Sequence, residues 1–394
     1  MSATAKRPEV LRRDLPAKVT YLGWALLWLG VILYAVGYMV EPRQAAFNNV
    51  IGFLFLASVA VGALFLVALE YITGAVWSVP MRRVVEFLAG LVPVAPLLAI
   101  PAFFHLHDVF QWTHSSAAAG DPVLAVKQPY LNVSAFGARF VGIFVLWTLF
   151  FWLFTRFSLR QDRTHDPKYT VFNTRLAAAF MPVFAVAITL LAVDWVMSLE
   201  AHWYSTIFGV YVFSGVVLAG LSVATYTIIR FRETGILPGL RPDHLYSLGA
   251  LQFAFINFWA YIAFSQFMLI WYGNLPEETF WFMMRWKHGW QYISILLILV
   301  QFWIPYFILL PQDAKMDPKR LKFVSLWLLG AHFVDLYWLV MPSYNGSVMI
   351  TWMEVGFPVV IVGTIISMLA FKMKRHNLMP VGDPKLERGW GFRM

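Results

Sequence analysis

Long apolar runs, each about as long as a lipid bilayer is thick, recur along this chain and are separated by short polar connections. A helix needs about 20 such residues to cross about 30 Å of hydrocarbon, and helices satisfy their own backbone hydrogen bonds there. We therefore predict an all-α integral membrane protein with ten transmembrane helices. They are expected at 20–40, 50–72, 84–106, 137–159, 176–199, 206–230, 246–272, 289–311, 321–341 and 350–371.

These spans account for nearly the whole chain. The sequence predicts one polytopic membrane domain over 1–394, with tails at 1–19 and 372–394 around a ten-helix bundle at 20–371. The first span follows a basic segment and lacks a small-residue cleavage site, so we expect it to be retained and not removed as a signal peptide. The longest connection, about 107–136, is too short for a separate soluble domain.

The basic residues lie mainly on one side of this predicted topology. All but five of the 30 Lys and Arg residues fall in the two tails or in the connections on the same side. Because basic loops stay in the cytoplasm, both termini are predicted there, in a bacterial cytoplasmic membrane. The net charge of +9 then reflects topology, and we do not expect nucleic-acid binding. The five on the outer side are Arg43, Lys127, Arg139, Arg285 and Lys287.

The amino-acid composition agrees with a membrane protein and excludes several kinds of cofactor site. Charged residues make up 13% of the chain, against about 25% in soluble domains. There is no cysteine, which excludes disulfides, thiolate-held iron–sulfur clusters and thioether-attached haem within this chain. His105 and His107 would diverge on a helix, so we predict no metal site. We also do not expect His105 and His332 to hold a b-type haem.

Two acids and a histidine interrupt the apolar pattern at the outer end of the fifth span, in VDWVMSLEAHW (193–203). On a helix Asp194, Ser198 and His202 would share one stripe. A charge at the bilayer centre costs about 2.5–3.5 kcal/mol, so such groups usually face a protein interior or a wet cavity. The stripe indicates either a proton-handling or ligand-binding edge, or an Asp194 helix cap with Glu200 and His202 in a hydrated loop.

Two more spans carry polar residues at helical spacing. His332 and Asp335 share a face of the ninth span, where a His–Asp pair could hold and pass a proton or could join helices. We favour the proton function, since a buried acid is costly. Asn257, Tyr261 and Ser265 share a stripe of the seventh span. They could carry a file of water, although interhelical hydrogen bonding is the commoner use.

Further polar residues lie near the ends of the predicted bundle. Glu70 closes the second span on the cytoplasmic side and Glu354 lies in the outer part of the tenth, an arrangement that would suit two half-channels for protons. His105 ends the third span, where it could line an outer pocket for a polar headgroup. The outer segment WFMMRWKHGWQY (281–292) sets basic residues among aromatics, which suits either a partner protein or a lipid headgroup.

A short internal repeat predicts how the helices are grouped. The motifs AVDWVMS and FVDLYWL occur in the fifth and ninth spans, which point the same way through the membrane. Spans 2–5 and spans 6–9 are therefore expected to form two four-helix bundles of like orientation, flanked by spans 1 and 10.

The segments VDWVMSLEAHWYSTIFGVYVFSG (193–215) and HFVDLYWLVMP (332–342), together with the ten-span layout, resemble the polysulfide-reductase/NrfD-like membrane subunits of bacterial alternative complex III. That complex is a quinol:electron-acceptor oxidoreductase whose acceptor is cytochrome c or a high-potential iron–sulfur protein. By length, this chain is similar to the shorter of its two sister membrane subunits.

The resemblance implies a scaffold with quinone binding and proton translocation through half-channels. It also implies partners that carry the haems and iron–sulfur clusters: a sister membrane subunit, an iron–sulfur subunit and multi-haem cytochrome c subunits, with membrane lipid around them. The proton-path candidates are Asp194, His332, Asp335, Glu70, Glu354, Ser198, Asn257, Tyr261 and Ser265. The quinone-pocket candidates are His105, Asp194 and His202.

A secondary transporter is the competing function. In such a protein the intramembrane carboxylates would bind substrate or coupling ions. Transporters often have spans that Gly or Pro interrupts near the midplane, whereas most prolines here lie near the ends of the spans. The sequence therefore favours the subunit of a redox complex.

Overall fold

The structure is a computed structural model that describes residues 12–114 and 120–394. Within these residues nine helical segments are long and apolar enough to cross a membrane, so the chain is an all-α, multi-pass integral membrane protein. They are α1 (Ala17–Val40), α2 (Pro42–Thr73), α7 (Val133–Thr164), α8 (Lys168–Trp195), α9 (Phe208–Glu233), α10 (Pro242–Gly273), Trp290–Leu309, Pro318–Ser343 and Trp352–Met373.

The last three segments are assembled from shorter elements. Trp290–Leu309 contains α12 (Trp290–Ile298), the π-helix η4 (Leu299–Trp303) and α13 (Ile304–Leu309). Pro318–Ser343 contains α14 (Pro318–Val340), and Trp352–Met373 contains α15 (Trp352–Gly356) and α16 (Pro358–Met373). Besides α3 and α4, which are described next, the remaining short α-helices among the described residues are α5 (Leu106–Val109), α6 (Pro122–Lys127), α11 (Pro276–Met284) and α17 (Leu386–Trp390).

The prediction of one continuous helix at 84–106 is wrong. This stretch forms α3 (Arg82–Ala89) and α4 (Ala95–Phe103), with turns between them at 90–94. Pro93 and Pro96 lie at this break, and a proline has no backbone N–H to continue the helical ladder. Hydropathy is continuous here, but the backbone hydrogen bonding is not.

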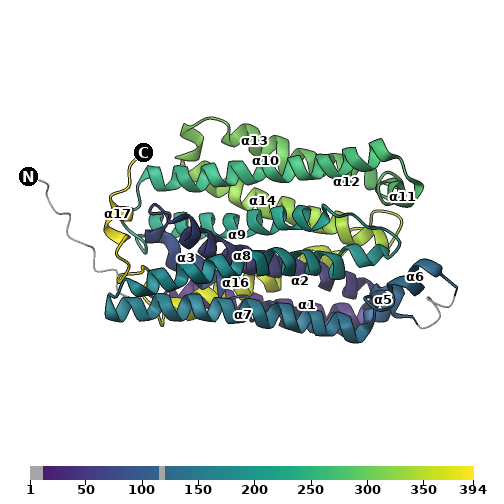
Figure 1. Cartoon of the computed structure of the whole chain (residues 1–394), viewed down its shortest axis with the longest axis horizontal. Helices are drawn as coiled ribbons and strands as arrows, with labels where there is room; N and C mark the ends of the chain where they lie inside the picture. The colour runs from purple at the N-terminus through teal and green to yellow at the C-terminus, as the bar shows by residue number, and fades with distance from the viewer. Residues whose placement is uncertain (1–11, 115–119) are drawn as a thin grey trace, which may run out of the picture.

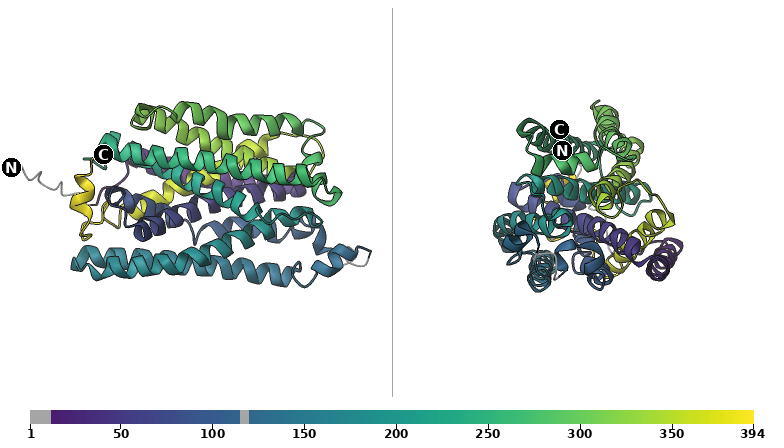
Figure 2. Two further views of the ribbon diagram at one scale, coloured as in Figure 1. Left: turned by 45° about the horizontal axis from the view of Figure 1, so that its top comes forward. Right: turned by 90° about the vertical axis from the view of Figure 1, so that its right-hand side faces the viewer.

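The long helices run side by side along the longest axis of the molecule (Figure 1). The start of α1 and the C-terminal α17 lie at one end, which we call the terminal end, while α5, α6 and α11 lie at the opposite end. Seen along the long axis, α1 and α16 form a pair at the periphery (Figure 2). The charge distribution still predicts that the terminal end faces the cytoplasm.

Helices α2 and α9 form the centre of the bundle, since nearly all of each is buried. They cross where Gly62 faces Gly220, and a Cβ added at Gly62 would lie 2.3 Å from the backbone oxygen of Val216. A similar contact joins α1 to α16 at Gly363, where an added Cβ would lie 2.2 Å from the backbone nitrogen of Leu27. Small residues thus let the backbones approach closely, as is common between membrane helices.

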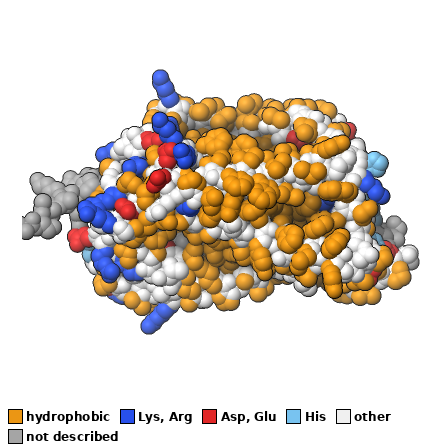
Figure 3. All heavy atoms as spheres, turned by 90° about the horizontal axis from the view of Figure 1, so that it is seen from above, with side chains coloured by type: hydrophobic (Ala, Val, Ile, Leu, Met, Phe, Trp, Pro, Cys, Tyr) orange, Lys and Arg blue, Asp and Glu red, His pale blue; other side chains and the backbone are white. Residues whose placement is uncertain are grey.

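The outer helices expose large apolar side chains, among them Trp28, Val141, Phe264 and Ile298. Figure 3 looks onto the side formed by α10 and α13, where hydrophobic side chains cover most of the surface and the charged ones gather at the terminal end. In water this surface would be unfavourable, but in a bilayer it is the expected lipid contact.

Beneath that charged end lies a buried cluster that we call the arginine network: Arg82, Arg83, Glu70, Glu86, Asp162 and Asp383. Arg82 joins Glu70 of α2 at 2.8 Å to Asp383 of the C-terminal segment at 2.7 Å. Arg83 joins Glu86 to Asp162 of α7, both at 2.6 Å. Ion pairs therefore connect four distant parts of the chain at this end of the bundle.

Candidate functional site

Asp335 of α14 lies in the interior of the bundle and is 2% exposed. Tyr211 of α9 donates its hydroxyl to Oδ1, and Trp259 of α10 donates its indole N–H to Oδ2 at 3.4 Å. Both donors are buried as well. Three helices thus converge on one carboxyl group, which has two hydrogen-bond donors and no basic partner among its described hydrogen bonds.

His332 lies one turn before Asp335 on the same face of α14, as the spacing predicts, and is also buried. Neither of its ring nitrogens has a hydrogen-bond partner among the described residues, so His332 and Asp335 share a face without bonding to each other. Gly215 of α9 makes room for the ring, because a Cβ there would lie 3.1 Å from its Cε1. The histidine is therefore free to bond to a small molecule beside it.

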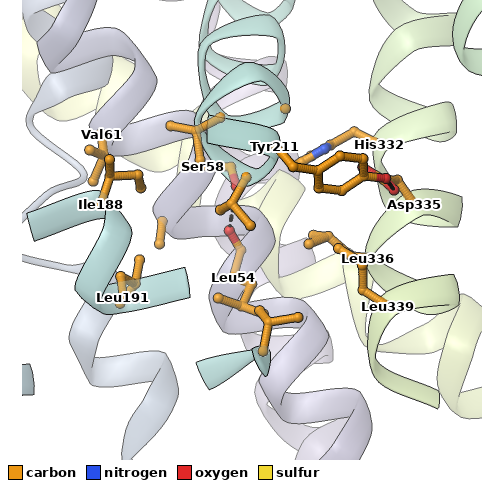
Figure 4. Close-up of a pocket in the computed structure, with 15 residues that line it drawn as sticks. Leu54, Ser58, Val61, Ile188, Leu191, Tyr211, His332, Asp335, Leu336 and Leu339 are labelled. Atoms are coloured by element: carbon orange, nitrogen blue, oxygen red, sulfur yellow. Dashed lines mark hydrogen bonds between the residues drawn. The ribbon is translucent and has the colours of Figure 1, made fainter. Parts of the chain in front are cut away.

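A cavity of about 20 Å³ adjoins these side chains. Its polar lining comes from Ser58, Tyr211, His332 and Asp335, and aliphatic side chains, mostly leucine and valine, close it elsewhere (Figure 4). A water molecule needs about 10–15 Å³ of such space and two to four polar partners. The cavity therefore has the size and the lining to hold one water against Asp335 and His332.

A second and much larger cavity, of about 730 Å³, lies among α9, α10, α11, α12, η4 and α14. Tyr211 lines both cavities, so its ring forms part of the wall between them. Tyr211 is not among the site residues predicted from the sequence, although it lies in segment 193–215. A phenol that bonds to a buried acid from another helix has no local sequence signal.

Asp194 has a different environment. Its two carboxylate oxygens accept hydrogen bonds of 2.8 and 2.9 Å from Arg139 of α7, and Arg139 also donates to the backbone oxygen of Tyr130. The guanidinium stacks on the Tyr130 ring at 3.8 Å. This bidentate ion pair joins α7 to α8 and favours a structural role for Asp194.

The predicted stripe of Asp194, Ser198 and His202 is wrong as a helical face, because α8 ends at Trp195 and a 3₁₀ turn follows at Met197–Glu200. Ser198 donates to the backbone oxygen of Asp194 at 2.5 Å. His202 is exposed and bonds to Asp121, which caps α6. Burial raises the pKa of Asp121, but hydrogen bonds from His202 and two backbone N–H groups outweigh it and lower that pKa overall.

The other polar candidates have local partners. Glu70 belongs to the arginine network, and Glu354 accepts hydrogen bonds from Gln44 at 3.0 Å and Asn48 at 2.7 Å. His105 bonds to Asp108 at 2.8 Å. His105, Asp194 and His202 each have a separate partner, and they line neither of the two cavities described above.

The polar stripe of α10 does not point into the centre of the bundle. Asn257 donates back to the backbone oxygen of Phe253 at 2.7 Å, Tyr261 is 66% exposed and Ser265 is half-buried. Asn257 and Tyr261 instead line the larger cavity. A continuous file of water along this stripe therefore has no support from these contacts.

The chain contains no cysteine, and no group of three or more His, Asp or Glu side chains that could hold a metal ion occurs among the described residues. No family model matches this sequence, and no curated protein matches it significantly.

Proposed function

We propose that this chain is a proton-handling membrane subunit of a respiratory quinol:electron-acceptor oxidoreductase of the alternative complex III type. Asp335 is its central protonatable group. In this proposal quinol oxidation and electron transfer use haems and iron–sulfur clusters on partner subunits, because this chain has no cysteine to hold an iron–sulfur cluster or to attach a haem through thioether bonds.

The observation that carries the proposal is the position of Asp335 between two cavities. On one side the carboxyl group meets space for a water and the unpaired ring of His332. On the other side it bonds to Tyr211, whose ring reaches the larger cavity. A carboxyl group with a water on one side and a phenol on the other can take a proton from one and give it to the other.

His332 would supply a second proton acceptor in the same cavity. Its neutral ring offers one lone pair to a water that also bonds to Asp335, so the two side chains would act through that water. Glu70 and Glu354 remain proposed entry and exit groups near the two ends of the bundle. Their present partners hold them in ion pairs or hydrogen bonds, so each would have to exchange partners to pass a proton.

The test is Asp335→Asn in the purified complex, reconstituted in liposomes. We expect quinol oxidation to continue while the number of protons moved per electron falls, because the amide keeps the shape but does not titrate. Asp166→Asn is the matched control, since Asp166 pairs with Lys168 outside the bundle. An unchanged proton-to-electron ratio in Asp335→Asn would refute the role of Asp335.

A secondary transporter remains the second candidate, because a buried carboxyl group near a large cavity would also suit an ion-coupled substrate site. Gentle solubilisation and purification through a tag on this chain separates the two. A subunit of the redox complex is expected to bring haem-containing partners with it. A colourless protein that purifies alone would favour the transporter.

A further inference from the structure

More than half of the residues that line the larger cavity are aromatic, which is unlike the small cavity at Asp335. We call it the lateral cavity. Its aromatic lining is Tyr211, Trp259, Tyr261, Phe264, Phe267, Trp281, Phe282, Trp286, Phe302, Trp303 and Trp338. Such a wall offers apolar contact with a few polar groups among it, as sites for lipophilic ligands do.

The lateral cavity extends along α10 from Asn257 to Phe267, which corresponds to about 15 Å at 1.5 Å per residue. Several of its lining residues are also exposed on the outside: Tyr261 by 66%, Trp286 by 57% and Trp303 by 45%. These residues belong to the apolar surface that faces the bilayer. The lateral cavity is therefore elongated and lies open toward lipid.

Arg285 lies at the end of α11 and is the one cation in this lining. It is 1% exposed, and its guanidinium lies 3.5 Å from the centre of the Trp281 ring. It donates to the backbone oxygens of Trp338 at 3.1 Å, Trp281 at 2.9 Å and Leu339 at 2.9 Å. Three of its five N–H groups are thus used, and all of them go to neutral acceptors.

No ion pair found among the described residues includes Arg285. Burial lowers its pKa to about 9, so the group is still cationic at neutral pH. The carboxylate of Glu200 interacts with Arg285 electrostatically but accepts its hydrogen bond from Ser343 and forms no described ion pair with the guanidinium. A buried cation that lacks an ion-pair partner is unfavourable, and an anion that reached the two remaining N–H groups would relieve this cost.

Gln266 adds a second polar group to the same lining. Its side chain is 4% exposed, and its Oε1 has no hydrogen-bond partner among the described residues. A buried carbonyl oxygen of this kind requires a donor. The lining thus presents a cation, an acceptor and the hydroxyl of Ser294, which bonds to the backbone oxygen of Arg285. Toward η4 its surface is aromatic and aliphatic apart from Asn257.

We propose that the lateral cavity binds an anionic phospholipid, with the phosphate at Arg285, a headgroup hydroxyl near Gln266, and an acyl chain along the aromatic wall toward Phe302. The charge of Arg285, which no described ion pair neutralises, favours this occupant over an uncharged lipophile. This inference does not depend on the proton function of Asp335. Of the two ligands that the sequence of segment 281–292 suits, a partner protein or a lipid headgroup, it favours the lipid headgroup.

The test is native mass spectrometry of the tag-purified protein, with the partners that accompany it, after equal exposure to phosphatidylglycerol and phosphatidylcholine. We expect the wild type to retain phosphatidylglycerol preferentially. Arg285→Gln should weaken that retention about tenfold or more, because the amide offers the phosphate no charge-assisted hydrogen bond. Lys287→Gln is the matched control, since it removes the same charge from an exposed neighbour outside the lining.

Ala263→Phe gives a second and independent variant. It fills the lateral cavity without touching the charge, so it should also reduce phosphatidylglycerol retention, even if Arg285→Gln does not fold. Equal retention of the two lipids by the wild type would overturn the proposal, as would full retention in Ala263→Phe. An uncharged isoprenoid quinone that is retained in preference to phosphatidylglycerol, and lost in Ala263→Phe, would also overturn it.

Discussion

Replacing Arg82 by Gln is expected to destabilise the protein more than any other single loss of charge at the terminal end. Arg82 is 2% exposed and lies among three buried carboxylates, those of Glu70, Glu86 and Asp383. Its guanidinium also lies 4.7 Å from the centre of the Tyr71 ring. The substitution leaves the three acids close together without the cation that separates them.

The magnitude follows from burial. Removing one partner of a buried ion pair costs about 3–5 kcal/mol, because the remaining charge is neither hydrated nor paired. Arg82 serves three acids, so the upper part of that range is expected. Asp383→Asn removes only one of these ion pairs and should cost less, while it loosens the C-terminal segment that Arg82 holds to the bundle.

The assay is thermal unfolding of the detergent-purified protein, followed by the fluorescence of its 18 tryptophans. Arg230→Gln is the control, because Arg230 is half exposed and pairs with Glu233 at 3.2 Å. An exposed pair of this kind contributes only about 0–1 kcal/mol. If Arg82→Gln and Arg230→Gln unfold at the same temperature, the arginine network is not a stabilising element and the reasoning is wrong.

Three further predictions concern other parts of the fold. Gly62→Ala should cost about 1–3 kcal/mol by overpacking the crossing of α2 and α9, measured by the same unfolding assay. Gly142→Ala, inside α7 with open space around it, should instead stabilise by up to about 1 kcal/mol. Asp194→Asn should cost about 1.5–3 kcal/mol by unpairing Arg139, and a result no larger than that of exposed Asp166→Asn would contradict this. Burial and neighbouring cations, Lys372 first among them, lower the pKa of His376 to about 4, below its ordinary 6.5. Between those pH values only the unfolded chain binds the proton, so stability should fall as the pH drops from 6.5 to 4, and His376→Gln should flatten that slope.

The membrane class could be predicted from the sequence because hydropathy and run length are local properties. Nine of the ten predicted spans correspond to helical segments of sufficient length and apolarity. The exception is 84–106. This stretch is apolar throughout, but hydropathy does not register that Pro93 and Pro96 interrupt the helical backbone hydrogen bonds between α3 and α4. The grouping into two four-helix bundles stays a prediction.

Residue partners could not be predicted in the same way. Spacing placed His332 and Asp335 on one face of α14, but it could not show that Tyr211, 124 positions away, bonds to Asp335. Likewise the sequence showed Asp194 as an acid in an apolar segment. It could not show that the ion-pair partner of Asp194 is Arg139, which lies 55 positions away on another helix. The break after Trp195 also separated residues that an extended helical stripe would have aligned.

By itself, the sequence determined that this chain is helical and spans a bilayer. The reason is that the length and apolarity of each run favour a helix in lipid, whichever helices pack against it. Only the tertiary structure decided which polar groups became paired and which stayed free, since a buried charge is stabilised by whichever helix happens to pack against it. Asp194 pairs with a guanidinium and Asp335 bonds to a phenol, while Arg285 has no described ion pair and lies beside an open cavity.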